Sequence, residues 1–167
     1  MIRKNINNYI FIPALILSML VQFTFLPQLF FWDIFPNLTL FILISGSFLH
    51  KNDLMLYLAF FSGLAFDVFS GQYFGVTMIS FLISVFISSY FGYHFLEEIF
   101  SLKLLLVSAL AVIAYNASFF ILMNIFNSYR YLEEAIRFFY VVEFDVLYLA
   151  VLIYPLTFLF SYNRNEK

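Results

Sequence analysis

The sequence predicts an all-α membrane protein in which about six transmembrane helices form a single domain over residues 1–167. Two observations predict this class: apolar residues are abundant, and they recur in stretches separated by short polar loops. Of the 167 residues, 64% are hydrophobic, 23% are aromatic and only 11% are charged, whereas soluble domains are about half apolar and about a quarter charged. A soluble domain of this length could not bury so much apolar surface. Lipid is therefore the expected solvent for most of the chain.

The composition also argues against several classes of function. The net charge of −2 provides no basic surface for nucleic acid. The chain has no cysteine, which excludes disulfides, thiolate metal sites and cysteine nucleophiles. It has no phosphate-binding loop or dinucleotide-binding glycine pattern, and no serine lies at an activating spacing from a basic partner. We therefore expect no enzymatic activity, no cofactor, no metal and no nucleic-acid partner.

Each spanning helix needs about 20 mainly apolar residues, and the chain divides into six such stretches. We predict spans over residues 9–26, 34–49, 54–69, 73–91, 104–126 and 141–160. The first span follows two basic residues and ends at Pro27. Because no small-residue cleavage site follows it, we interpret it as an uncleaved anchor and not as a signal peptide.

The second span begins near Ile34 or Pro36 and ends before His50, and the third begins directly after Asp53. Both are near the lower length limit for crossing the hydrocarbon, so we expect their neighbours to shield them. A re-entrant hairpin formed by these two spans is the alternative. Gly71 and Gly75 mark the turn into the fourth span.

The fifth span follows the polar stretch 93–98, and the sixth contains Pro155. The connection between them, residues 127–139, alternates apolar and charged residues. That spacing suits a short amphipathic helix on the bilayer surface. An extension of the preceding helix with a solvated face is the alternative.

The basic residues predict the orientation, because they concentrate on the cytoplasmic side of membrane proteins. With the N-terminus inside, six basic residues fall on the cytoplasmic side: Arg3, Lys4, Lys51, Lys103, Arg164 and Lys167. Only Arg130 and Arg137 fall on the opposite side. We therefore predict that both termini are cytoplasmic.

Ionisable side chains within spans are candidates for function, because their burial in lipid is costly. Asp67 lies at the end of the third span, where a carboxylate opposes the helix dipole. It has three possible roles: capping the next turn, contacting a partner, or coupling to a proton or ion. Glu143 and Asp145 open the sixth span and project about 200° apart on a helix, so we interpret them as interfacial anchors. His50 and His94 are interpreted as interfacial polar residues at cytoplasmic helix ends.

Small residues recur at a spacing that allows helices to approach closely. Ala14 and Ser18 are four apart in the first span, and Ser84 and Ser88 are four apart in the fourth. Residues 45–47 of the second span are all small. We expect these positions to lie between packed helices.

One region carries a more specific pattern. Pro36-Asn37-Leu38 opens the second span, and Gly63-Leu64-x-x-Asp67 is followed by Ser70-Gly71 and then by Gly75. In this pattern and in its helical layout, the chain resembles the rod shape-determining protein MreD family. Many members carry an acid after the proline, where this chain has Asn37. The resemblance makes six residues the candidate partner contacts: Pro36, Asn37, Gly63, Asp67, Gly71 and Gly75.

The resemblance implies a non-enzymatic scaffold of the bacterial inner membrane, within the elongasome that builds the peptidoglycan wall. Family members are taken to bind MreC, a single-span protein with a large periplasmic part. Through MreC they connect to the cytoplasmic MreB filament, to the RodA glycosyltransferase and to its transpeptidase partner. The implied role is to organise peptidoglycan synthesis and cell shape, in contact with these proteins and with membrane lipid.

The family is also similar in fold to the S-components of energy-coupling-factor vitamin transporters. The alternative function is therefore that of a substrate-binding subunit of a vitamin transporter. That alternative predicts a polar, aromatic-lined cavity open to the outside.

Overall fold

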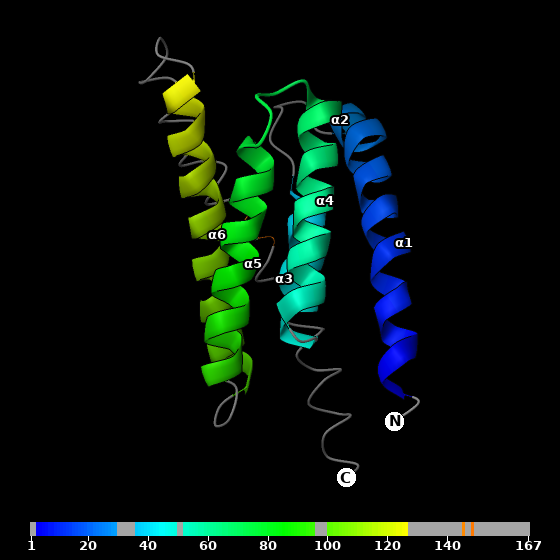
Figure 1. The fold of residues 1–167 in the computed structure, drawn as a ribbon, viewed down its shortest axis with the longest axis vertical. Helices are drawn as coiled ribbons and strands as arrows, with labels where there is room; N and C mark the ends of the chain where they lie inside the picture. Colours follow the sequence, from blue (N-terminus) through cyan, green and yellow to red (C-terminus); the bar gives the residue numbers. More distant parts are fainter. Residues whose placement is uncertain are drawn as a thin grey trace.

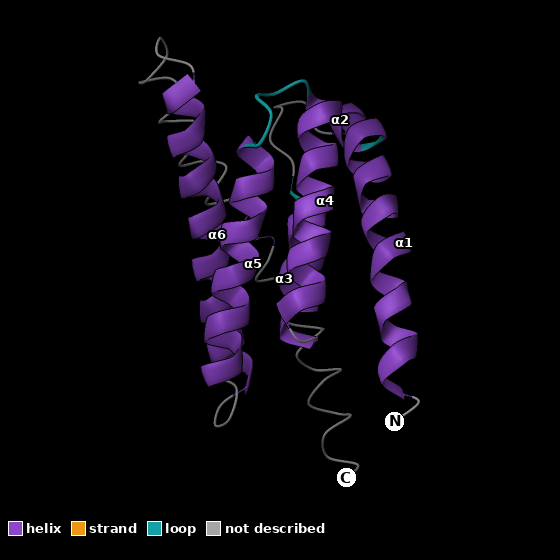
Figure 2. Cartoon of the chain, viewed as in Figure 1, coloured by secondary structure: helices purple, strands orange, loops and turns teal. Residues whose placement is uncertain are grey.

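The computed structural model describes residues 3–29, 36–49, 52–95, 100–126, 145 and 148, and the regular structure among them is entirely helical (Figure 2). The elements are α1 (Arg3–Thr24), α2 (Leu26–Leu29), α3 (Leu38–Leu49), α4 (Asn52–Ser70), α5 (Val76–Phe95) and α6 (Phe100–Phe126). The all-α class is confirmed for this part of the chain. Helices α1, α3, α4, α5 and α6 occupy the first five predicted spans. Residues 127–139 and all of the sixth span except Asp145 and Tyr148 lie outside the described residues.

The long helices run side by side along one direction of the molecule (Figure 1). Helix α4 is joined to α5 by a short turn, and this turn lies at the same end of the bundle as α2. Helix α1 begins at the opposite end (Figure 1). We call the two ends the turn end and the start end.

Helix α3 is the central element, because it contacts α1, α4, α5 and α6. Its residues Leu40, Leu43 and Ile44 are fully buried. With 12 residues, α3 is only about 18 Å long, which is shorter than the roughly 30 Å of bilayer hydrocarbon. Its neighbours surround it, as expected for a short span that needs shielding.

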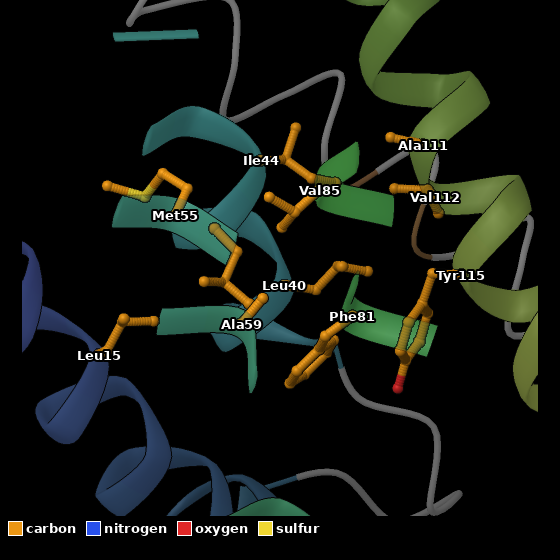
Figure 3. Close-up of a cluster of buried hydrophobic side chains, with 11 residues drawn as sticks. Leu15, Leu40, Ile44, Met55, Ala59, Phe81, Val85, Ala111, Val112 and Tyr115 are labelled. Atoms are coloured by element: carbon orange, nitrogen blue, oxygen red, sulfur yellow. The ribbon is translucent and has the colours of Figure 1, made fainter. Parts of the chain in front are cut away.

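The core is built around α3 from side chains of all five long helices (Figure 3). The rings of Phe81 and Tyr115 stack, with centroids 5.3 Å apart, and Phe66 meets Phe81 edge-on at 5.9 Å. The complete cluster comprises Leu15, Leu40, Leu43, Ile44, Met55, Ala59, Phe81, Val85, Ala111, Val112 and Tyr115. This cluster joins α5 and α6 to α1, α3 and α4.

Two helical segments of the described residues are long and apolar enough to cross a membrane. They are Asp53–Ser70, with 18 residues, and Leu105–Phe126, with 22 residues. Three shorter apolar segments, Phe11–Thr24, Leu38–Phe48 and Val76–Phe91, lie beside them. No more than about a third of the residues of each long segment are buried against the rest of the chain, and the others are half-buried or exposed.

Polarity is distributed in an unusual way. Most buried polar residues are serine or threonine, and the rest carry amides or carboxylates: Ser18, Gln22, Thr39, Ser47, Ser62, Asp67, Thr77, Ser80, Ser84, Ser88, Ser89, Ser108, Asn116 and Asp145. Large apolar side chains such as Leu17, Phe61 and Phe86 point outward instead. The described helices thus have a partly polar interior and an apolar exterior.

Candidate functional site

Asp67 links α4 to the beginning of α5. Its Oδ1 accepts a hydrogen bond from the Thr77 amide at 2.8 Å, and its Oδ2 accepts from the amides of Gly75 at 2.8 Å and Met78 at 3.3 Å. The first amides of a helix have no partner within that helix, so this carboxylate caps α5 from a neighbouring helix. Asp67 is only 2% exposed. Of the roles considered from the sequence, capping is the one that these contacts show.

The two glycines of the turn adopt conformations that other residues rarely adopt. Gly71 has φ 66° and Gly75 has φ 95°. A side chain is disfavoured at positive φ even where space is available, and a Cβ at either glycine would meet nothing within 4 Å. The predicted turn between the third and fourth spans is confirmed, and backbone conformation explains its glycines.

Gly63 serves a different purpose, because it allows α4 and α5 to approach closely. A Cβ at this position would lie 2.9 Å from the Met78 amide nitrogen and closer still to the Met78 Cα. Both atoms belong to backbone, so neither can move aside alone. Gly63 and Asp67 therefore fix the same stretch of α5, one by close packing and the other by hydrogen bonds.

Asn37 caps α3 and ties it to α6. Its Oδ1 accepts from the Leu40 amide at 3.0 Å and its carbonyl accepts from the Phe41 amide at 3.1 Å, which is the usual N-cap arrangement. Its Nδ2 donates to the Tyr115 hydroxyl at 3.1 Å. Pro36, directly before this cap, is buried. An amide at position 37 thus performs a capping role that needs no charge.

Several of the small residues singled out in the sequence lie at helix contacts. Ser18 Oγ lies 3.3 Å from Thr39 Oγ1, between α1 and α3. Ser47 Oγ and Ser88 Oγ are 2.7 Å apart, between α3 and α5. Ser84 Oγ donates to the α6 carbonyl of Ala111 at 2.8 Å. Each of these hydroxyl groups meets an oxygen atom of a neighbouring helix, at a place where the two helices pack closely.

A cavity of about 280 Å³ lies beside the Asn37 cap and the α4–α5 turn. Its polar lining consists of Gln22, Asn37, Ser70, Gln72, Tyr115, Asn116 and Asp145. The rings of Phe23, Phe66 and Phe119 form its apolar walls. The cavity therefore draws residues from α1, α3, α4, α6 and the sixth predicted span to one place.

Asp145 lies inside the bundle. It is 5% exposed, and its Oδ2 accepts a hydrogen bond from Asn116 Nδ2 at 3.3 Å. The backbone amide of Asn37 also bonds to it. The interpretation of Asp145 as an interfacial anchor did not include this environment, in which amide groups on α6 and before α3 donate hydrogen bonds to the carboxylate within the bundle. Glu143, His50 and the His94 side chain lie outside the described parts of the structure.

The structure divides the six candidate contact residues between two neighbouring features. Gly63, Asp67, Gly71 and Gly75 build the α4–α5 turn, whereas Pro36 and Asn37 begin α3 beside the cavity. The residues between Asp67 and Gly75 present an exposed apolar surface, which we call the turn patch: Val68, Phe69, Tyr73 and Phe74. The motif residues position the backbone, and the turn patch provides the accessible side chains.

Sequence reasoning missed Gln22, Gln72, Tyr115 and Asn116 as parts of one site. The signal available for Gln22 and Asn116 was an amide within an otherwise apolar span, since polar groups in spans face the bundle interior. No sequence pattern linked them to Asp145, because the three residues come from three different helical segments. Only their packing brings them together.

Comparisons of this chain with protein-family models, with curated proteins and with solved structures found no match.

Proposed function

We propose that the chain is an MreD-like scaffold of the rod-shape complex, which binds MreC in the bacterial inner membrane. In this proposal it has six spans, with both termini in the cytoplasm and the α4–α5 turn on the periplasmic side. It has no catalytic role of its own. Through MreC it connects to MreB, to RodA and to the transpeptidase partner of RodA, and so helps to organise peptidoglycan synthesis.

The distribution of polarity supports a membrane location. In a soluble protein the exposed Phe61, Phe69 and Phe86 would face water, and the buried hydroxyls and amides would replace apolar core. In lipid the same arrangement is favourable, because helices associate there through small and polar residues while apolar side chains face the acyl chains. The uncovered faces of Asp53–Ser70 and Leu105–Phe126 fit this environment.

One observation carries the scaffold role: the MreD-like motif holds an exposed aromatic surface in a fixed position. Phe69 is 72% exposed and Phe74 is 66% exposed, while Asp67 and Gly63 immobilise the backbone on either side of them. Aromatic side chains on a rigid backbone contribute strongly to protein contacts, because little conformational entropy is lost on binding. A periplasmic juxtamembrane segment of MreC would reach this turn in the proposed orientation.

The test is co-purification of MreC with tagged variants of the turn patch. Phe69→Ala combined with Phe74→Ala is expected to weaken MreC binding by about thirty-fold or more, since the loss of even one aromatic anchor costs roughly 2 kcal/mol or more. Tyr57→Ala is the matched control. It lies on α4 near the start end and is 67% exposed, so we expect its recovery of MreC to stay unchanged.

Undiminished recovery with the double variant, at normal membrane insertion, would contradict the proposed contact. Equal losses with the double variant and with Tyr57→Ala would point to a general effect of removing aromatic surface from α4, and would contradict it as well.

The cavity favours a second candidate, a vitamin-binding transporter subunit. Its polar and aromatic lining is what that function requires. Its volume of about 280 Å³ lies just below the roughly 300–1,000 Å³ of pockets for drug-sized ligands, which weighs against a vitamin with a large ring system. Native mass spectrometry of the purified protein discriminates the two: a stoichiometric vitamin supports the transporter subunit.

A further inference from the structure

We infer that the cavity beside the α4–α5 turn binds a small organic cation, an ammonium or guanidinium group, on the carboxylate of Asp145. This inference goes beyond the proposed scaffold role and does not depend on it. Charge, aromatic lining, size and access each support it.

Asp145 gives the cavity its charge. It is the one ionisable carboxylate or base among the described residues that line the cavity, and it is buried. Its described partners, the Asn116 side-chain amide and the Asn37 backbone amide, are neutral donors. A buried carboxylate is costly when no positive charge accompanies it. A cation in the cavity would supply that charge.

The aromatic walls suit a cation that is organic and not a hydrated metal ion. Phe23 and Phe66 lie with ring centroids 4.6 Å apart, and Tyr115 and Phe119 lie with centroids 6.0 Å apart. All four line the cavity. Ring faces attract ammonium and guanidinium groups, more strongly where water is excluded. Ammonium and guanidinium groups also donate several hydrogen bonds, which the carboxylate and nearby oxygen atoms can accept.

The size and the lining of the cavity limit what can enter. A volume of about 280 Å³ suits a single amine or guanidine with a short alkyl chain, or the end of one basic side chain. Gln72 lines the cavity and is exposed, so access lies at the α4–α5 turn. Ser70 Oγ is buried without a hydrogen-bond partner in the described structure and also lines the cavity, so it offers a further acceptor.

The binding test uses the full chain in lipid nanodiscs with two probes of matched shape, n-propylguanidinium and neutral n-propylurea. Titration calorimetry is expected to show saturable binding of the guanidinium and about ten-fold weaker binding of the urea, because charge-assisted hydrogen bonds are roughly twice as strong as neutral ones. Asp145→Asn should weaken guanidinium binding by about ten-fold or more. Asp53→Asn is the control, since Asp53 is exposed and lies on the first turn of α4 at the start end.

Equal affinities for the two probes, or no binding of either, would overturn the inference. Unchanged guanidinium binding in a well-folded Asp145→Asn protein would overturn it too. If Asp145→Asn is not monodisperse, the comparison of the two probes on the unaltered chain decides the question alone.

The natural cation has two possible sources, a free amine or the basic side chain of a membrane partner, and the same titration separates them. It is repeated on the chain co-purified with MreC, the proposed partner. Binding that is blocked in the complex assigns the cavity to a partner side chain, whereas unchanged binding assigns it to a free amine. Failure to recover MreC contradicts the proposed scaffold role alone, because binding to the isolated chain is measured separately.

Discussion

Asp67 connects two helices with a single side chain. It belongs to α4, yet its carboxylate accepts the first amides of α5 and the amide of Gly75 before it. The first amides of a helix have no partner within that helix, and a buried amide left without an acceptor is costly. The residue that looks like a functional charge in the sequence is therefore a structural acceptor in the fold.

Asp67→Ala is expected to lower the free energy of unfolding by roughly 2 kcal/mol or more, because three backbone amides lose a charged acceptor. Denaturant titration of the purified chain in micelles measures this change. Asp53→Ala is the comparison: it removes an exposed carboxylate from the first turn of α4 and should cost less than about 1 kcal/mol. Similar effects of the two substitutions would contradict the capping role.

The α4–α5 pair behaves as one structural unit. Gly63 brings the two helices into backbone contact, Asp67 caps the second helix, and the positive φ angles of Gly71 and Gly75 reverse the chain. Four of the six candidate contact residues thus belong to one helical hairpin. Gly63 and Asp67 lie four residues apart on α4 and contact α5, and Gly71 and Gly75 lie in the turn that follows.

Gly63→Ala is expected to destabilise the chain by about 1–3 kcal/mol, since the added methyl group would overlap the Met78 backbone and force the helices apart. Gly46→Ala is the matched substitution on α3. Its Cβ would lie 2.5 Å from Met55 Sδ, 3.0 Å from Met55 Cε and 3.1 Å from a ring carbon of Phe11; all three atoms belong to side chains, which can shift more easily than backbone. Alanine also improves helix propensity by about 1 kcal/mol, so Gly46→Ala should be nearly neutral. Thermal unfolding midpoints compare the two, and a larger loss for Gly46→Ala would contradict this account.

At the scale of the whole molecule, polar side chains lie between the helices and large apolar side chains point outward. We call the polar contacts between helices the seam. Hydroxyls join α1 to α3, α3 to α5 and α5 to α6, and the cavity lies at the turn end of this seam. Hydrogen bonds between helices are an available means of association in lipid, where the hydrophobic effect does not hold helices together. Orientation in the bilayer remains a prediction from the basic residues, whose side chains lie outside the described residues.

Cysteine labelling tests that orientation directly, because the chain has no cysteine of its own. Asp53 and Gln72 are exposed; Asp53 lies on the first turn of α4 and Gln72 lies two residues beyond its end, so they are separated by the length of this 19-residue helix, about 28 Å. Gln72→Cys is expected to react with a membrane-impermeant maleimide from outside the inner membrane. Asp53→Cys should react only after permeabilisation. The opposite result would reverse the proposed topology, and external labelling of both would argue against a spanning α4.

The sequence alone predicted much of the helical layout. Helix α4 was expected over residues 54–69 and extends over Asn52–Ser70, and the turn was recognised from Gly71 and Gly75. Such features depend on local composition and backbone conformation, which the sequence displays directly. The small residues of α1, α3 and α5 were likewise identified as contacts, because helical spacing shows which residues share a face.

What only the tertiary structure decided was the partner of each polar group. The sequence determined that Asp67 and Asp145 are carboxylates within apolar segments, and hence that each needs a compensating environment. It could not show that Asp67 meets the amides of α5 or that Asp145 meets Asn116. Hydrogen bonds act over about 3 Å, whereas these partners are 10 and 29 residues apart in the chain. The packing of helices around α3 sets those distances, and with them the cavity.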